Sequence, residues 1–395
     1  MSKLERLIQQ YCPDGVEYYK VKDIYKRIKG TPITAGKMKE IANSSGSVRI
    51  FAGGKTAIDA NEEDIPNATI TKVPAVLVQS RGVIDVIYYD KPFTFKNELW
   101  GYTTDNKIAV KYLYYVLKNN VQVFRDAASG MGALPQISLK VTEDFEIPVP
   151  PLPVQEEIVR ILDTFTELQA ELQAELQKRL QQYNHYRDNL LSFEGRDDIV
   201  YKKLGEVCEF RNGFAFKSNL FKNDGCPIIR ITNISGHGVN MEDVKYFHME
   251  DYPKIKMSLF EVSNGDILVA MSGATTGKIG TYKEEDTAYL NQRIGKFIPK
   301  QRLDNRFLYH FLLTQVNEMY RISGGGAQPN LSSNDLKSKI LIPLPSLEEQ
   351  KRIASILDRF DTLTNDLTSG LPAEMEKRRQ QYEYYRDRLL TFKRL

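Results

Sequence analysis

Residues that build covalent frameworks and metal sites are scarce in this sequence. Its 395 residues include three cysteines, Cys12, Cys208 and Cys226, and none belongs to a Cys-x-x-Cys pair. The four histidines, at positions 185, 237, 248 and 310, show neither the spacing of zinc ligands nor a His-Glu-x-x-His motif. A disulfide-stabilised secreted domain and a zinc enzyme are therefore not expected.

Long apolar segments are also missing. The N-terminal residues MSKLERLIQQYCPDG contain no apolar core of a signal peptide, and no stretch approaches the ~18 uncharged apolar residues of a membrane helix. We therefore expect a cytoplasmic protein without membrane attachment. A hydrophobic fraction of 42% is ample for the cores of two or three domains.

Catalytic motifs are a third absence. The sequence has neither the glycine-rich cofactor loop nor the Asn/Asp-Pro-Pro-aromatic tetrapeptide of an adenine methyltransferase, and its carboxylates form no recognisable nuclease pattern. Residues 272–280, SGATTGKIG, are similar to a phosphate-binding loop, but they have one residue too few between the glycines and Ile279 in place of the hydroxyl. We expect no catalytic residues and no cofactor or metal bound by this chain.

What the sequence does contain is a long internal repeat. Residues 147–165, IPVPPLPVQEEIVRILDTF, match residues 342–360, IPLPSLEEQKRIASILDRF, at ten of nineteen positions. Residues 179–193 match residues 378–392 at ten of fifteen positions, with four extra residues in the second copy between the two blocks. A repeat of this length governs the architecture and has to be interpreted before any short motif.

Each copy predicts a proline-rich segment followed by a long helix. The prolines up to Pro153 exclude a helix before Gln155, and apolar residues then recur at spacings of three and four, as in a coiled coil, through Phe193. The stripe comprises Ile158, Ile161, Phe165, Leu168, Leu172, Leu176, Leu180, Tyr183 and Leu190, and in the second copy Ile353, Ile356, Phe360, Leu363, Tyr382, Tyr385 and Leu389. Packing the two copies side by side buries both stripes, although two independent surface helices remain an alternative. Ser369, Gly370 and Pro372 predict a break within the second helix.

The N-terminus resembles the exit from the first long helix. Residues 2–10 predict a short amphipathic helix, and an antiparallel second helix would bring Phe392 back to it, which makes the repeat pseudo-cyclic. The fold class expected is α+β, with two mixed α/β domains separated by two long antiparallel coiled-coil helices. The expected segments are the short helix (1–17), the first domain (18–146), the first proline-rich segment and helix (147–195), the second domain (196–341) and the second proline-rich segment and helix (342–395).

The two intervening domains share a pattern of short strands and loops. Short β-branched runs bounded by Gly, Pro or Asp occur in both. Four pairs of segments correspond: LVQSRG (77–82) with LVAMSG (268–273), FKNELWG ending at Gly101 with YLNQRIG ending at Gly295, KYLYYVL (111–117) with RFLYHFL (306–312), and SGMGALPQIS (129–138) with SGGGAQPNLS (323–332). We interpret them as two domains of one family that diverged in their loops.

Binding chemistry is concentrated in these loops. A net charge of +3 does not by itself indicate a nucleic-acid ligand, but Lys and Arg lie in glycine-rich loops, whereas acids and amides lie in the helices. The glycine-rich segments expose backbone amides that can approach phosphate, and Arg, Lys, Asn and Gln are the side chains that read guanine and adenine edges. The candidate DNA contacts are Arg81, Lys96, Asn97, Ser129 and Gly130 in the first domain, and Arg230, Asn233, Ser272, Thr275, Thr276, Lys278, Asn291, Gln292, Arg293, Gly324, Gly325, Gln328 and Asn330 in the second.

The whole chain resembles the DNA-specificity subunit of Type I restriction-modification systems. The resemblance rests on the repeated Q-x-x-I-x-x-I-L-D signature at residues 155–163 and 350–358, and on the loops LVAMSGATTGKIG and YLNQRIG. The first domain departs from this pattern, since QSRGVIDVI replaces MSGATTGKI.

The resemblance implies a non-catalytic subunit. Each target-recognition domain would read one half of a split site in double-stranded DNA, with the helices as a ruler between them. Two modification subunits carrying S-adenosylmethionine would dock on the helices and methylate a flipped adenine in each half, and two restriction subunits using ATP and Mg could join. The docking residues it implies are Gln155, Ile158, Tyr183, Arg187, Gln350, Ile353, Tyr382 and Arg386.

Three alternatives remain open at this point. One is the specificity subunit of a related multi-subunit system that cleaves on both sides of its site. Another is a fused restriction-methyltransferase, which the missing methyltransferase motifs disfavour. The third is a coiled-coil assembly protein without DNA contact, which the diversified loops disfavour.

Overall fold

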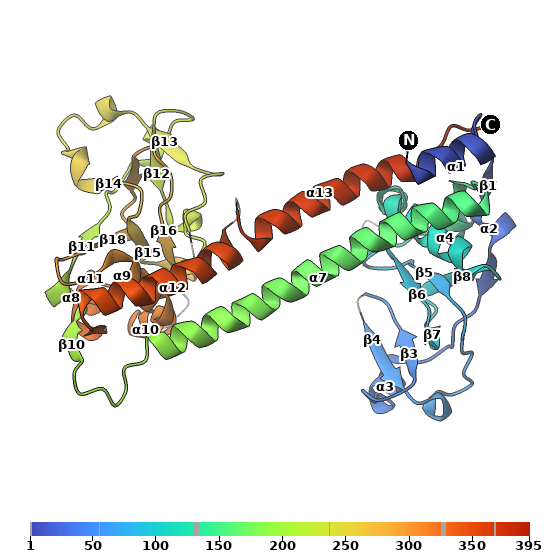
Figure 1. Ribbon diagram of the computed structural model, residues 1–395, viewed down its shortest axis with the longest axis horizontal. Coiled ribbons are helices and arrows are strands. Elements are labelled where there is room, and N and C mark those ends of the chain that lie inside the picture. The colour runs from blue at the N-terminus through green and yellow to red at the C-terminus, as the bar shows by residue number, and fades with distance from the viewer. Residues whose placement is uncertain (1, 55, 129–133, 237, 325–328, 367–368) are drawn as a thin grey trace. The chain divides into compact units, whose positions relative to one another are not determined.

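A computed structural model describes residues 2–54, 56–128, 134–236, 238–324, 329–366 and 369–395. The chain forms two compact units, one comprising Met1–Glu171 and Met375–Leu395 and the other Leu172–Glu374. Each unit contains one β-rich domain together with parts of the long helices (Figure 1). The α+β class and the two mixed domains are as predicted.

The first unit contains three small sheets. Strands β1 (Tyr18–Lys20) and β9 (Glu146–Pro148) form an antiparallel pair. The larger sheets have the orders β2 (Lys26–Ile28), β8 (Leu99–Thr103), β5 (Ala75–Gln79), β6 (Asp85–Tyr89) and β4 (Ala57–Ala60), β3 (Val48–Phe51), β7 (Phe93–Phe95). The helices preceding β9 are α1 (Lys3–Tyr11), α2 (Val21–Ile24), α3 (Ala35–Glu40), η1 (Glu62–Asp64), α4 (Lys107–Asn119), α5 (Val121–Asp126) and α6 (Leu139–Glu143).

The second unit repeats this plan. Strands β10 (Val200–Lys203) and β19 (Leu341–Leu344) form the antiparallel pair. The larger sheets have the orders β11 (Cys208–Asn212), β18 (Ile294–Pro299), β15 (Ile267–Ala270), β16 (Ile279–Thr281) and β13 (Lys245–Phe247), β12 (Cys226–Ile229), β17 (Ala288–Leu290), β14 (Glu261–Val262). Its helices include α8 (Leu204–Val207), η3 (Ile231–Asn233), η6 (Gly273–Thr275), α9 (Asn305–Thr314), α10 (Val316–Ile322) and α11 (Ser333–Lys339).

The strand orders of the two domains correspond, with β14 of the second domain as an additional strand. In the four-stranded antiparallel sheets, β2, β8, β5 and β6 of the first domain correspond to β11, β18, β15 and β16 of the second. The neighbouring sheet of each domain contains one parallel pair, β3 with β7 in the first domain and β12 with β17 in the second. The internal duplication inferred from the helices therefore extends to the domains.

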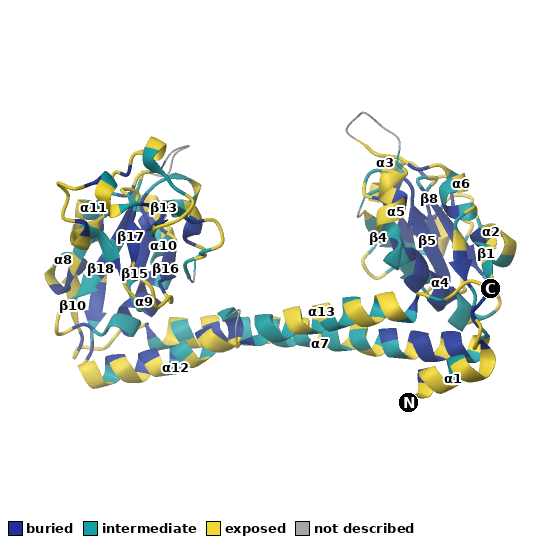
Figure 2. Ribbon diagram, turned by 90° about the horizontal axis from the view of Figure 1, so that it is seen from above, coloured by how far each residue is buried: buried dark blue, intermediate teal, exposed yellow. Residues whose placement is uncertain are grey.

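The central strands are buried on both faces, which explains why their sequences are apolar without alternation. In β5, Val76 and Val78 pack with α4, while Ala75 and Leu77 face the aromatic cluster of the second sheet. Strand β15 divides in the same way between α9 and the second sheet. Figure 2 shows the buried residues gathered along these strands. Because successive side chains point to opposite faces, one strand serves two cores.

The first long helix, α7 (Leu152–Leu190), begins three residues earlier than predicted. Pro153 lies in its first turn, where a backbone N–H has no partner within the helix, so proline is tolerated there. The predicted break in the second copy is confirmed, because α12 (Leu347–Asn365) ends before α13 (Leu371–Leu389) begins. A Cβ on Gly370 would lie 2.4 Å from the carbonyl oxygen of Thr362, so this junction requires glycine.

Within each unit the helices pack antiparallel. In the first unit, Phe165 of α7 contacts Tyr385 and Tyr382 of α13 at ring-centroid distances of 5.7 and 6.2 Å, and Leu390 joins the core around Ile158. In the second unit, Tyr186 of α7 stacks on Phe360 of α12 at 5.3 Å. The predicted stripe is wrong at Leu363, which is 36% exposed. Helix α12 turns its buried face, including Ala354 and Leu357, toward α9 rather than along a continuous seam.

The chain closes on itself within the first unit. Helix α1 is capped by Ser2 and Glu5, and Lys3 forms an ion pair with Glu157 of α7 at 2.7 Å. The backbone N–H of Leu395 donates to the carbonyl of Val16 at 3.1 Å, and the Tyr18 hydroxyl donates to the carbonyl of Phe392 at 2.9 Å. The C-terminal residues therefore complete the domain that the N-terminal residues begin, as the pseudo-cyclic repeat predicts.

Candidate nucleic-acid interface

In each domain the segment after the central strand meets the glycine-rich segment. In the first, the Gly82 N–H donates to the carbonyl of Pro135 at 2.9 Å, and the Ile137 N–H donates to the carbonyl of Ser80 at 2.9 Å. The equivalent bonds in the second domain, from Gly273 to Pro329 and from Leu331 to Met271, measure 3.1 and 2.7 Å. Two of the predicted segment correspondences are thus confirmed. The candidates Ser129, Gly130, Gly325 and Gln328 lie outside the described residues.

Several predicted contacts in the second domain come together around this junction. The Thr275 hydroxyl donates to the carbonyl of Ile231 at 3.5 Å, which joins η6 to η3 beside Arg230. The Met271 N–H donates to the carbonyl of Arg293 at 2.8 Å and so brings in the β17–β18 connection. The exposed candidates here are Lys278, Gln292, Arg293, Gly324 and Asn330, and Ser272, Thr275 and Asn291 are half-buried.

Two predicted contacts are corrected because their side chains serve the fold. Asn233 is 3% exposed, and its amide donates to the carbonyls of Asn240 and Asp243 at 3.0 and 3.2 Å. Thr276 is 4% exposed and donates to the carbonyl of Gly273 at 2.7 Å. Residue type alone cannot separate such buried polar groups from ligand contacts, since both satisfy hydrogen bonds.

Arg230 contacts an acidic residue. Its Nη2 lies 3.2 Å from the carbonyl oxygen and 3.4 Å from the carboxylate of Asp243, whose side chain is exposed. Its Nε is shielded and has no hydrogen-bond partner among the described residues.

The first domain contains a cavity of about 590 Å³. It is lined by Gly53, Gly54, Arg81, Gly82, Val83, Glu98, Leu134 and Pro135.

Of the described candidates in the first domain, Arg81 lines this cavity, and Lys96 and Asn97 precede the lining residue Glu98 in the chain. Arg81 and Asn97 are exposed, whereas the Lys96 side chain is 18% exposed and forms an ion pair with Glu98 at 3.2 Å. The Ser80 N–H and hydroxyl donate to the carbonyl of Glu98 at 2.9 and 2.7 Å. Glu98 was not among the sequence candidates, because an acid is not the residue expected beside DNA.

One predicted segment correspondence is wrong by one residue. Leu77 of β5 pairs with Gly101 of β8, whereas its counterpart Leu268 of β15 pairs with Lys296 of β18. Gly101 therefore corresponds to Lys296 and not to Gly295. The glycine shared by FKNELWG and YLNQRIG misled the alignment, and a slip of one residue moves every side chain to the other face of a strand.

Most of the residues predicted to dock a partner are buried, which corrects that prediction. Gln155, Ile158, Tyr183, Gln350 and Ile353 are at most 5% exposed. Gln350 donates to the carbonyls of Pro345 and Arg302 at 2.9 and 3.1 Å and accepts from the Asp304 N–H at 2.8 Å. These side chains fasten the helices to their own domains, so they are not available to a partner.

The remaining docking candidates form matched clusters on the helices. Arg187 lies over the Tyr183 ring at 5.6 Å and pairs with Asp188 at 2.8 Å. Arg386 lies over the Tyr382 ring at 5.6 Å and pairs with Asp387 at 2.9 Å. Tyr382 is half-buried. The repeat thus presents the same arginine twice, once in each unit.

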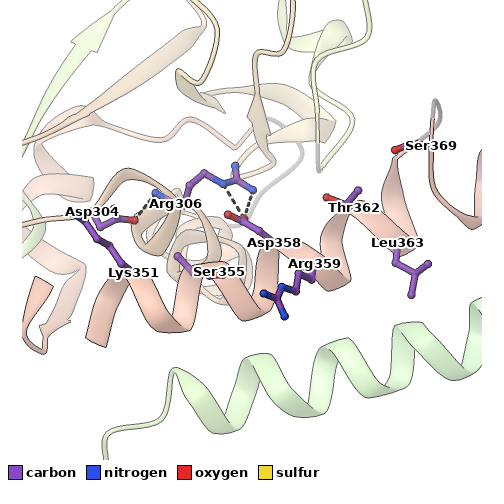
Figure 3. A pocket seen from close by; sticks show the side chains of 10 residues that line it. Asp304, Arg306, Lys351, Ser355, Asp358, Arg359, Thr362, Leu363 and Ser369 are labelled. Carbon is purple, nitrogen blue, oxygen red and sulfur yellow. Dashed lines mark hydrogen bonds and ion pairs between the residues drawn. The ribbon is translucent and has the colours of Figure 1, made fainter. Parts of the chain in front are cut away.

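The last residue of each helix signature, Asp163 or Asp358, is bound by side chains of the adjoining domain. We call this arrangement the clamp. In the second unit, Arg306 Nη2 and His310 Nε2 donate to Asp358 at 2.6 and 2.7 Å, beside a cavity of about 660 Å³ (Figure 3). In the first unit, Lys111 pairs with Asp163 at 3.3 Å and the Tyr115 hydroxyl donates to it. Burial would raise the pKa of Asp358, but the hydrogen bonds from His310 and Arg306 outweigh it and lower that pKa.

Among the described residues, no group of three or more His, Cys, Asp or Glu side chains is arranged to hold a metal ion. In the same part of the chain, no helix combines the length and apolarity needed to cross a membrane.

Comparison with known proteins identifies the duplicated domain. The family described as Type I restriction modification DNA specificity domain matches residues 13–182 and again residues 196–377. The chain belongs to this family. Both matches include a β-rich domain and much of a long helix, so the family's unit is the repeat that the sequence displays.

Relatives of this specificity-domain family cover most of the chain. The Type I restriction enzyme EcoR124I/EcoR124II specificity subunit of Escherichia coli is 33% identical over 73% of this chain and 72% of its own. A putative type I restriction enzyme specificity subunit of Haemophilus influenzae is 34% identical over 72% and 73%. The crystal structure of the S subunit from M. genitalium has the same fold, with a TM-score of 0.66 at 17% identity over 96% of this chain and 97% of that one.

Proposed function

We propose that this chain is the non-catalytic DNA sequence-specificity subunit of a Type I restriction-modification complex. The observation that carries the proposal is the duplicated interface: two domains with one strand order present equivalent loops whose exposed side chains differ. A protein that reads two unlike half-sites requires this combination, because the scaffold repeats while the readout changes. The specificity subunits among its relatives support the same function.

The proposed ligand is double-stranded DNA. Lys278 and Arg293 can neutralise phosphates or read guanine, Gln292 and Asn97 can read adenine, and exposed Gly324 allows close approach of the backbone. Phosphate contacts would position each domain, and base contacts would select its half-site.

The proposed partners supply the chemistry. Two modification subunits with bound S-adenosylmethionine would methylate adenine, and two restriction subunits would use ATP and Mg, in the cytoplasm. Repeated Arg187 and Arg386, with the exposed Tyr186 and Tyr385 beside them, support docking of the same partner twice. This chain itself is proposed to bind no cofactor.

The proposed spacer is α7, whose 39 residues run without interruption through both units. A helix of this length spans about 58 Å at roughly 1.5 Å per residue. Such an element would set the number of base pairs between the half-sites.

Domain exchange tests the proposal. The full chain, with residues 201–341 replaced by those of another specificity subunit, is co-expressed with modification subunits in a host that lacks adenine methylation. Single-molecule sequencing should then find a bipartite motif in which one half has changed and the other is that of the unaltered chain. A change in both halves, or in neither, contradicts modular reading.

A further inference from the structure

Two side chains of opposite charge occupy one position of the duplicated interface. The backbone bonds fix the equivalence: the Lys96 N–H donates to the carbonyl of Phe51 as the Asn291 N–H donates to that of Ile229. The Ser80 N–H donates to the carbonyl of Glu98 at 2.9 Å, and the Met271 N–H donates to that of Arg293 at 2.8 Å. Glu98 therefore corresponds to Arg293, which the sequence alignment through the shared glycine obscures.

The residues directly before Glu98 and Arg293 have kept the same chemistry. Asn97 corresponds to Gln292, and both are exposed amides. An amide matches adenine in both domains, since it can accept from N6 and donate to N7. The reversal of charge therefore occurs at Glu98 and Arg293 themselves, although the backbone hydrogen bonds that position them are equivalent in the two domains.

Glu98 carries a carboxylate with unsatisfied hydrogen-bonding capacity. It lines the 590 Å³ cavity beside Arg81, and Lys96 lies 3.2 Å from its Oε1. Its Oε2 is shielded from solvent and has no hydrogen-bond partner among the described residues. A shielded, unpaired acceptor is costly, so a ligand that supplies an N–H at this place is favoured.

Arg293 offers the opposite chemistry. It is exposed, and no ion pair of its guanidinium is present among the described residues. A guanidinium matches the O6 and N7 acceptors of guanine, whereas a carboxylate accepts from the N4 amine of cytosine. Near phosphates a lone carboxylate is repelled, and Lys96 offsets that repulsion at Glu98.

We propose that Glu98 and Arg293 are the base-discriminating residues of one shared position, with Glu98 selecting cytosine in one half-site and Arg293 selecting guanine in the other. This inference rests on the proposed function, because it assigns specificity within DNA reading. Because Glu98 accepts hydrogen bonds and Arg293 donates them, the two domains would read different bases although the backbone at this position is held in the same way.

Isosteric variants of the full chain test it, in complex with the modification subunits. Glu98→Gln should shift one half-site position from cytosine toward adenine, and Arg293→Gln should shift the other from guanine toward adenine. The contact of Arg293 with guanine is bidentate and implies a change in preference of about 5- to 150-fold, and the single hydrogen bond from cytosine N4 to Glu98 implies a smaller change. Glu63→Gln, at an exposed acid of η1, is the control and should leave the motif unchanged.

The outcomes separate this inference from the proposed function. A wild-type complex that methylates no bipartite motif contradicts the proposed function. A wild-type motif that lacks a G·C pair in either half, or a folded variant with an unchanged motif, contradicts the inference alone. Uniform loss of binding to all sequences would make these residues phosphate contacts, which also overturns it. Because Arg293 is exposed, its variant keeps the test available even if Glu98→Gln fails to fold.

Discussion

At the residue scale, the repeated signature is explained by attachment of each helix to its own domain. Gln155 donates to the carbonyl of Pro150 at 2.8 Å, and Gln350 makes the matching bond to Pro345 at 2.9 Å. Asp163 and Asp358 receive the domain's cation in the same way. These residues are repeated because the helix–domain joint is repeated.

The clamp on Asp358 predicts a dependence of stability on pH. Its folded-state pKa lies below the usual value of 3.8, so its stabilising contribution is complete above that pH and is lost as the pH falls through the folded pKa. Asp358→Asn should therefore lower the unfolding free energy by about 2 kcal/mol at pH 7, and by progressively less in acid.

Urea unfolding of the two proteins between neutral and acidic pH measures this difference. Asp197→Asn, at an exposed position after α7, serves as the control. A difference that stays constant into acid would show that the charge of Asp358 does not stabilise the fold.

At the element scale, close packing decides the strand register that sequence similarity misassigned. Gly101 and Gly295 look equivalent in sequence, yet they occupy adjacent positions in the two sheets. A Cβ on Gly101 would lie 2.7 Å from Ile28 Cγ1 and 2.9 Å from Leu77 Cδ2, while one on Gly295 would lie 1.9 Å from Phe210 Cζ. Each glycine makes room for a different neighbour.

Gly101→Ala should destabilise the first domain by about 1–3 kcal/mol, because the added methyl group overpacks a buried sheet. Gly36→Ala is the matched control: nothing lies within 4 Å of its Cβ, and it belongs to helix α3. That substitution should be neutral or stabilising by up to about 1 kcal/mol. Chemical denaturation compares the two variants. Equal effects would mean that the space around Gly101 can relax.

At the scale of the whole molecule, α7 contains a tandem repeat, ELQA at 167–170 and again at 171–174. Deleting residues 171–174 should shorten the gap of the bipartite motif by about one or two base pairs without altering either half. Removing four residues shortens the helix by about 6 Å. It also turns the residues after the deletion by about 400°, which leaves them only about 40° from their original direction.

Methylated motifs of the deletion variant and the intact chain measure the gap. Deletion of residues 172–173 is the control, since it rotates the following residues by about 200° and should abolish methylation. An unchanged gap in the four-residue variant would rule out α7 as the spacer.

The sequence by itself determined the duplication, the α+β class, the long helices, the break near Gly370 and the concentration of binding chemistry in loops. These features are local or repetitive, so periodicity and self-comparison reveal them. Tertiary structure alone decided which polar side chains are buried and hydrogen-bonded within the fold and which are exposed. The fold buries the side chains of Asn233, Thr276, Gln155 and Gln350. The strand register places Glu98 at the position that corresponds to Arg293. Both outcomes depend on contacts between segments that are distant in the chain.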